Sequence, residues 1–291
     1  MQMNSPSQTS SANRVLSAVA VAQYRREGYY YPVPAISADE ALTYRRRLEA
    51  HEATTGGPIA GSMRHKSHLL FTWLWALVHE PRIVDAVEDV LGPNLLCWST
   101  NFFIKEANDP SFVSWHQDAT YWGLSTPDVM TTWVAFTPAT IANGAMKVAP
   151  RTHTQQLAHR DTFEPNNLLT RGQEIAVDVA KDASIDMPLQ AGQMSLHHVL
   201  LAHGSEPNRT NDRRIGLAIR YVPTHVHQIN GDRGSATLVR GVDTFHHFDL
   251  EHAPEADLSP AALAQHQAVT GRQAMILYRG TATASFDNIV R

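Results

Sequence analysis

The residues of this sequence that are best suited to carry chemistry are two histidines and one aspartate. His116 and Asp118 stand two positions apart in the segment Ser-Trp-His-Gln-Asp at 114–118, and His203 follows much later in the chain. If the segment is extended, His116 and Asp118 project to the same side, because side chains two positions apart share a face of a strand. Two imidazoles and one carboxylate leave three positions of an octahedral metal open, and this ligand set suits Fe(II) and the activation of dioxygen. The sequence therefore predicts a metal site formed by these three residues.

An arginine that could bind an anionic cosubstrate follows the last predicted ligand in the sequence. Arg214 stands eleven residues after His203. A guanidinium group binds a carboxylate through two parallel hydrogen bonds, which a lysine cannot do. We therefore expect Arg214 to bind the distal carboxylate of a keto-acid cosubstrate.

Each part of this set also has a simpler interpretation. The His-x-Asp spacing arises by chance in surface and core segments, and Arg214 alone could be a solvated side chain. The adjacent pair His197 and His198 competes with His203 for the role of third ligand, although neither needs a metal to explain it. The combination of the three features is less expected by chance than any one of them, and it keeps the metal site as the leading hypothesis.

Composition excludes several classes of protein. The chain has 291 residues, with 24 Lys and Arg against 28 Asp and Glu, so it lacks the basic excess of a nucleic-acid-binding protein. The longest apolar stretches, such as residues 69–78, are too short to cross a membrane. The single cysteine, Cys97, excludes an internal disulfide and fits a reducing compartment. We therefore expect a cytoplasmic protein that binds neither nucleic acid nor membranes, and the 16 histidines become its most unusual feature.

Helical patterns dominate the first third of the chain, and strand-like patterns dominate the rest. Residues 1–12 have the composition of a disordered segment, and we expect one domain over residues 13–291. Ser37 and Glu40 have the spacing of a helix-starting capping box. The predicted helices span residues 15–24, 39–52, 69–78, 81–91 and 257–269. The predicted strands span residues 29–33, 95–105, 129–137, 144–149, 175–179, 194–198, 215–222 and 274–278.

Short strands in irregular succession indicate a particular fold class. Because no long helices alternate with the strands, the pattern favours an antiparallel sandwich or barrel over a parallel sheet. The fold class is therefore α+β with a mainly β core. Two segments without regular patterns, 56–66 and 225–247, are expected to be an exposed loop and a candidate lid.

Four segments together resemble a known family. They are Trp-His-Gln-Asp at 115–118, Asn-Gly-Ala-Met-Lys-Val-Ala-Pro-Arg-Thr-His at 143–153, His-Gly-Ser-x-x-Asn at 203–208 and Arg-Arg-Ile-Gly-Leu at 213–217. On these motifs the chain is identified as a member of the phytanoyl-CoA dioxygenase family of Fe(II)/2-oxoglutarate-dependent oxygenases, over roughly residues 20 to 280. Arg151 and Thr152 stand where many members of the family have Gly-Ser.

The resemblance implies a fold and a set of residue roles. The fold is a double-stranded β-helix, also called a jelly roll or cupin-like fold, with N-terminal helices packed on one sheet. The iron ligands would be His116, Asp118 and His203. Four residues would surround the 2-oxoglutarate cosubstrate, namely Arg214 and its helper Ser205 at the distal carboxylate, and Asn101 and Trp133 along the pocket.

The resemblance also implies a reaction. With Fe(II), 2-oxoglutarate and O2, such an enzyme hydroxylates an unactivated C–H of a small molecule and decarboxylates 2-oxoglutarate to succinate and CO2. Asp118 favours this outcome over chlorination, because halogenases on the same scaffold have a small residue in its place. Tyr121 and Trp122, close after the ligands, are expected to contact the substrate.

Several alternatives stay open at this point. Desaturation, demethylation and halogenation use the same scaffold. A zinc-dependent hydrolase or isomerase would use the same ligands without Arg214, and a non-catalytic jelly-roll protein would need neither. The sequence does not name the substrate, and a homo-oligomer is compatible with the alanine-rich stretches at 15–23 and 257–269.

Overall fold

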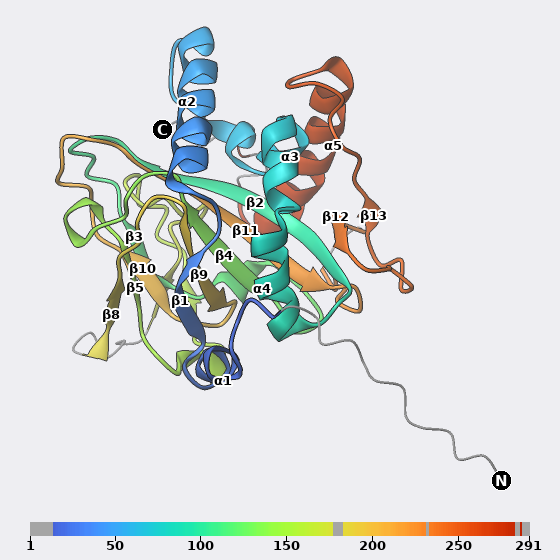
Figure 1. Cartoon of the computed structure of the whole chain (residues 1–291), viewed down its shortest axis with the longest axis horizontal. Helices are drawn as coiled ribbons and strands as arrows, with labels where there is room; N and C mark the ends of the chain where they lie inside the picture. Colours follow the sequence, from blue (N-terminus) through green and yellow to red (C-terminus); the bar gives the residue numbers. More distant parts are fainter. Residues whose placement is uncertain (1–13, 177–182, 231–232, 283–285, 287–291) are drawn as a thin grey trace.

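Two β-sheets face each other, and helices cover the outer side of the larger sheet (Figure 1). This computed structural model describes residues 14–176, 183–230, 233–282 and 286. The segment expected to be disordered, 1–12, lies outside the described residues, as does most of the strand expected at 175–179. The architecture confirms the predicted jelly roll with a mainly β core.

The strands of the larger sheet come from the whole length of the chain. In spatial order they are β1 (Tyr29–Pro34), β9 (Gln193–His198), β4 (Met130–Ala135), β11 (Arg214–Pro223), β2 (Leu95–Lys105), β12 (Ser235–Arg240) and β13 (Asp249–Leu250). The smaller sheet has the order β3 (Val113–His116), β10 (His203–Ser205), β5 (Met146–Val148) and β8 (Ile185–Met187), and β6 (His159–Arg160) pairs with β7 (Glu174–Ile175). Neighbouring strands are antiparallel except for the short pair β12 and β13.

The helices lie before and after the β core in the sequence. They are α1 (Ala18–Glu27), α2 (Ala38–Thr55), α3 (Thr72–Val78), α4 (Pro81–Leu91) and α5 (Pro260–Leu277). Short 3-10 turns connect the other elements: η1 (Gly61–Arg64), η2 (Ser67–Leu69), η3 (Asp118–Tyr121), η4 (Ile141–Asn143) and η5 (Thr152–Thr154).

Strand β11 decides which side chains reach the space between the sheets. Its odd-numbered residues from 215 to 221 belong to the apolar core beneath the helices. Because side chains alternate along a strand, Arg214, Ala218 and Arg220 point the other way, and all three line the inner cavity. One strand therefore supplies both apolar packing for the helices and two buried cations for the space between the sheets.

A bulge in β2 changes this alternation next to the cavity. The pairing register between β11 and β2 shifts between Arg220 and Tyr221, opposite Ser99 and Cys97. A bulge inserts one extra residue and re-aims the side chains beside it. As a result Trp98 and Ser99, although adjacent in the sequence, line the same cavity.

The start of α2 agrees with the sequence. The Ser37 hydroxyl accepts a hydrogen bond from the Glu40 backbone N–H at 3.1 Å, and the Glu40 carboxylate accepts one from the Ser37 N–H at 2.6 Å. Both bonds of the predicted capping box are therefore present, and they satisfy two N–H groups that the first turn leaves unpaired.

This cap leads to a stability prediction. The change Ser37→Ala removes the acceptor for the Glu40 N–H and should lower the free energy of unfolding by about 0.5–2 kcal/mol. Urea unfolding followed by circular dichroism measures the difference. Ser37→Asp is the matched control, because aspartate also caps helices and should keep most of the stability. Equal stability of the alanine and aspartate variants would contradict a capping role.

The prediction of a strand at 274–278 is wrong, because helix α5 continues to Leu277. Val269, Gln273 and Leu277 are buried at intervals of four residues, which is the helical period. Gly271 is the one helix-weakening residue between the two predicted segments, and a single glycine does not end a helix that packs along its length.

The prediction that residues 56–66 form an exposed loop is also wrong at two positions. Ile59 and Lys66 are buried. The Lys66 ammonium donates hydrogen bonds to the Glu251 carboxylate and to the Ser235 carbonyl, and a charge can be buried only with such partners. These partners lie far away in the sequence and become neighbours only in the fold. No helix among the described residues is long and apolar enough to cross a membrane.

Candidate functional site

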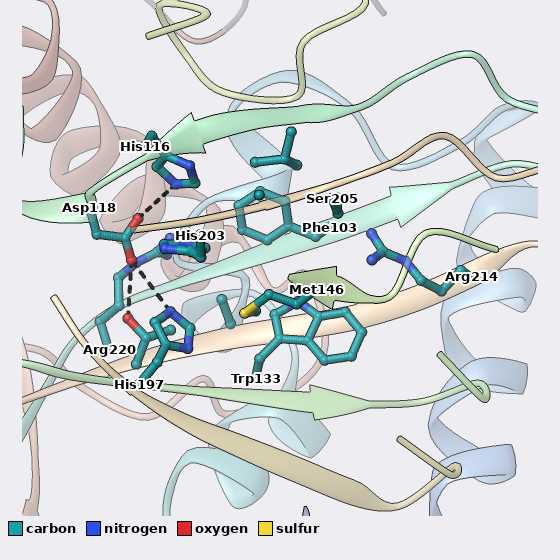
Figure 2. Close-up of a pocket in the computed structure, with 14 residues that line it drawn as sticks. Phe103, His116, Asp118, Trp133, Met146, His197, His203, Ser205, Arg214 and Arg220 are labelled. Atoms are coloured by element: carbon teal, nitrogen blue, oxygen red, sulfur yellow. Dashed lines mark hydrogen bonds and ion pairs between the residues drawn. The ribbon is translucent and has the colours of Figure 1, made fainter. Parts of the chain in front are cut away.

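The three predicted metal ligands converge in the structure. His116 ends β3 and His203 begins β10, and the two are direct partners in the pairing of these strands. The strand expected at 114–118 ends at His116, so Asp118 comes from the first position of η3. One ligand atom from each of the three buried side chains lies within 4.8 Å of the others. Figure 2 shows the cluster at one end of a cavity between the sheets.

The two histidines have the tautomer that metal binding requires. Nδ1 of His116 lies 2.9 Å from the Ser114 carbonyl, and Nδ1 of His203 lies 2.9 Å from the Leu201 carbonyl. A carbonyl oxygen only accepts, so each Nδ1 carries a hydrogen, and Nε2 is the ring nitrogen that each histidine can offer to a metal. Nε2 of His116 is 3.4 Å from Oδ1 of Asp118. Potential ligand atoms of all three residues therefore face one another, and this arrangement fits a bound cation.

The charge states also fit a metal. Burial raises the pKa of Asp118, but the contacts with His116 and His197 and the charge of Arg220 outweigh it and hold the pKa well below its usual range. Burial and the neighbouring imidazoles hold the pKa of His203 well below its ordinary value. The aspartate is thus ionised and His203 is neutral, which are the forms that coordinate metals.

The cavity beside this cluster is closed at its far end by Arg214 (Figure 2). About 400 Å³ of atom-free space, part of it open to solvent, lies in this cavity, and both sheets contribute to its walls. Phe103, Trp133 and Met146 lie between the cluster and Arg214. This apolar middle section separates a metal-binding end from a cationic end, so the cavity suits an elongated anion that also binds metal.

The Arg214 guanidinium is buried, and not all of its N–H donors have a hydrogen-bond partner among the described residues. Its Nη1 donates to the Gly144 carbonyl at 2.8 Å, and its Nε has no hydrogen-bond partner among the described residues. The group lies 5.2 Å from the centre of the Trp133 ring. Burial lowers the pKa of Arg214 to about 10, so the side chain stays positively charged at neutral pH. A buried cation without a carboxylate partner fits an anionic ligand.

Ser205 has a partner that the sequence did not reveal. Its Oγ accepts a hydrogen bond from Nζ of Lys105 at 2.7 Å, and the same nitrogen also donates to the Glu206 carbonyl. Because the Ser205 oxygen accepts this bond, its own hydrogen stays free to donate into the cavity that it lines. Burial, and secondarily the charge of Arg214, lower the pKa of Lys105 to about 6.

Trp133 depends on a glycine in the neighbouring strand. A Cβ atom at Gly216 would stand 1.9 Å from Cζ2 of Trp133, far inside van der Waals contact. Any larger residue at 216 would therefore push the indole ring away from β11 and out of its place beside Arg214.

The remaining predicted site residues lie elsewhere. Asn101 lines a second cavity and not the one between the cluster and Arg214. Trp122 also lines this second cavity, at whose wall Asp118 stands. Tyr121 lines neither cavity, since its hydroxyl donates to Asp161 and the Arg171 guanidinium lies over its ring.

Two residues of the site were not assigned to it from the sequence, His197 and Arg220. Nε2 of His197 lies 3.9 Å and Nε of Arg220 lies 4.0 Å from Oδ2 of Asp118, which also accepts a hydrogen bond from Thr131. Neither ring nitrogen of His197 has a hydrogen-bond partner in the described part of the chain. Alternation was the signal that could have found His197, because Met194 and Leu196 belong to the core beneath the helices, so the next residue, His197, must point to the opposite face, where the cavity lies.

Comparisons with known proteins identify the family of the chain. The family model described as phytanoyl-CoA dioxygenase (PhyH) matches residues 12–216. The probable alpha-ketoglutarate-dependent hypophosphite dioxygenase of Stutzerimonas stutzeri is 30% identical over 158 residues, covering 53% of this chain and 54% of that protein. The chain spans about half the length of the first curated relatives it matches.

Two solved structures resemble the chain over most of its length. The apo form of the non-heme monooxygenase ThoJ is 37% identical with a TM-score of 0.80, covering 89% of this chain and 97% of that one. CytC3 with Fe(II) and alpha-ketoglutarate is 26% identical with a TM-score of 0.62, covering 85% of this chain and 97% of that one.

Proposed function

The chain belongs to the phytanoyl-CoA dioxygenase family, and on this premise we propose that it is an Fe(II)/2-oxoglutarate-dependent dioxygenase that hydroxylates an unactivated C–H of a small molecule. One observation carries the proposal. Two imidazole nitrogens and one ionised carboxylate converge at one end of a cavity, and a guanidinium that has no carboxylate partner among the described residues closes the other end.

In this proposal His116, Asp118 and His203 hold the iron. Their Nδ1–H bonds to backbone carbonyls keep the two rings in place and keep each Nε2 free. Oδ1 of Asp118 faces His116, whereas Oδ2 is held by Thr131. Asp118 would therefore present one oxygen to the metal and would keep the other in the protein's own hydrogen bonds.

Arg214, Ser205 and Trp133 hold 2-oxoglutarate in this proposal. The guanidinium and the Ser205 hydroxyl donate to its distal carboxylate, and the Trp133 ring packs against its carbon chain. Phe103 and Met146 complete an apolar wall that excludes water from the cosubstrate.

Bound Fe(II), with 2-oxoglutarate and O2, supplies the oxidising power for the C–H bond and releases succinate and CO2. The protein contributes binding, orientation and a cavity from which water is excluded. The Asp118 carboxylate would occupy the coordination position that a halide needs, so the proposal favours hydroxylation over chlorination.

Two measurements test this function. Anaerobic addition of Fe(II) and 2-oxoglutarate to the apo protein should produce a weak visible charge-transfer band, and air should then lead to succinate. Mass spectrometry of a turned-over substrate should show the gain of one oxygen atom. The absence of the band from metal-loaded protein would contradict the proposal, and a chlorinated product would contradict hydroxylation.

Lys105 leads to a pH prediction for cosubstrate binding. With a pKa of about 6 in the free protein, Lys105 is largely neutral at pH 7–8. A carboxylate bound beside Ser205 and Arg214 favours the charged ammonium, so binding takes up a proton above pH 6. The dissociation constant of 2-oxoglutarate should therefore rise with pH between 6.5 and 8.5, by at most about tenfold per pH unit.

Titration of the charge-transfer band at constant iron occupancy measures this dependence. In the variant Lys105→Met the dependence should flatten. Lys147→Met is the control, because that partly exposed lysine pairs with the Glu206 carboxylate and does not line the cavity. A pH dependence that is the same in the wild type and in Lys105→Met would rule out Lys105 as its source.

A further inference from the structure

A second cavity adjoins the first beside Asp118, one of the three proposed iron ligands. The two share Phe103, Asp118 and Arg220 as walls, and the second contains about 460 Å³ of atom-free space, part of it open to solvent. Neither the proposed iron ligands nor the residues proposed for 2-oxoglutarate account for this space. It opens beside Asp118, where a molecule must lie if one of its C–H bonds is to face the metal.

Arg220 is the charged group of this second cavity. Its side chain is only 9% exposed, and its closest acid is Asp118, with Nε 4.0 Å from Oδ2. It makes no hydrogen bond to any residue in the described ranges, and its Nε is buried without a partner. Asp118 is its one ion-pair partner among the described residues, and Arg220 would have to share this carboxylate with a bound metal. A buried guanidinium in this state is stabilised by an anion from outside the chain.

The other side chains that line the second cavity indicate what else its ligand must contain. Trp98 and Trp122 lie with their ring centres 4.9 Å apart, and Leu169 adds aliphatic surface. The Arg220 guanidinium lies 5.0 Å from the centre of the Trp122 ring. Gln273 of α5 donates its Nε2 hydrogen to Ser99 at 3.2 Å, while its buried Oε1 has no donor among the described residues. Among the described residues, the cavity thus offers an apolar wall, the Arg220 cation and the free Gln273 oxygen. The polar side chains of His65, Asn101, Thr170 and Gln173 complete its lining.

We propose that the second cavity binds the substrate and that the substrate is a small molecule with an oxyanion group, such as a carboxylate or a phosphonate, that pairs with Arg220. This inference rests on the proposed function. An apolar part of the substrate packs against the two tryptophans, and a hydroxyl or N–H group donates to Gln273. Because Arg220 is next to Asp118, the carbon that is oxidised lies within a few bonds of the anionic group.

Matched pairs of anions and neutral analogues test the proposal without a known substrate. The protein is loaded anaerobically with Fe(II) and saturating 2-oxoglutarate, so that the Arg214 end is occupied. Propionate, phenylacetate and methylphosphonate are then compared with propionamide, phenylacetamide and dimethyl methylphosphonate. A change in the charge-transfer band reports binding beside the metal. A thermal shift measured on the same samples reports binding independently of the band.

At least one anion is expected to bind tenfold or more tightly than its neutral analogue. Whether the carboxylates or the phosphonate show this preference identifies the kind of oxyanion. Arg220→Gln should remove the preference and keep the band, and Arg220→Lys should retain part of it. Arg209→Gln makes the same change of charge at an exposed position and should behave as the wild type.

Several results would overturn the inference. One is a band that forms normally but responds to anions no more than to their neutral analogues. Another is an unchanged preference in Arg220→Gln. A third is a weaker binding of 2-oxoglutarate in Arg220→Gln with no response to any anion, which would place Arg220 at the cosubstrate. The comparison within the wild type decides the matter even if the glutamine variant does not fold.

The two proposals fail in different ways. Absence of the band would contradict the proposed iron and cosubstrate site, while the thermal shifts would still show whether an anion binds. A normal band with no preference for anions would contradict the substrate class alone.

Discussion

Replacement of His116 by alanine should abolish turnover and should weaken iron binding more than any substitution outside the ligand set. Loss of a residue that only orients a ligand costs roughly 10–100-fold in metal affinity, so loss of the ligand itself should exceed 100-fold. The imidazole of His116 supplies one of three converging acceptors, and the two that remain cannot hold the metal as tightly. Titration with Fe(II) or Co(II), followed by absorbance, measures the affinity, and succinate formation measures the turnover.

The same titration decides between the two candidates for the third ligand. His203→Ala should lose the metal as His116→Ala does. His197→Ala should keep it, because His197 faces Oδ2 of Asp118 and not the converging ligand atoms. The exposed His227 provides the control variant His227→Ala, which should bind metal as the wild type does. Metal loss in His197→Ala with retention in His203→Ala would reverse the assignment.

Replacement of Arg214 by alanine should raise the dissociation constant of 2-oxoglutarate by roughly 10²–10⁴-fold. Two charge-assisted hydrogen bonds to the distal carboxylate would be lost, at about 1.5–3 kcal/mol each. Iron binding should stay normal, because Arg214 stands at the opposite end of the cavity from the metal cluster (Figure 2). Titration of the charge-transfer band in iron-loaded protein measures the change.

Binding of a shorter keto acid distinguishes the loss of a carboxylate contact in Arg214→Ala from a general loss of structure. Pyruvate chelates a metal in the same way but has no distal carboxylate, so its affinity should be the same in Arg214→Ala and in the wild type. Arg213 is not an alternative, because it pairs with Glu52 and Glu106 and does not line the cavity. An unchanged affinity for 2-oxoglutarate in Arg214→Ala would therefore move the carboxylate site to Arg220.

Much of the local structure followed from the sequence. Helix α4 and strand β2 have the predicted bounds, and the capping box at Ser37 is present, because each depends on residues within one short window. The wrong prediction of a strand at 274–278 also came from reading one short window of sequence. A short apolar run has no intrinsic preference between helix and strand, and the packing of α5 along its length decided it.

The sequence by itself determined the family and the β-rich fold, and it predicted the three residues whose side chains converge between the sheets, since residue type and spacing carry that information. Only the tertiary structure decided how these residues meet. The pairing of β3 with β10 places His116 opposite His203, and the contact of Lys105 with Ser205 joins residues 100 positions apart. The side chains of His197 and Arg220 face the cavity because strand register sets which face of a sheet each side chain occupies. Such contacts depend on the relative positions of distant segments, which no local pattern records.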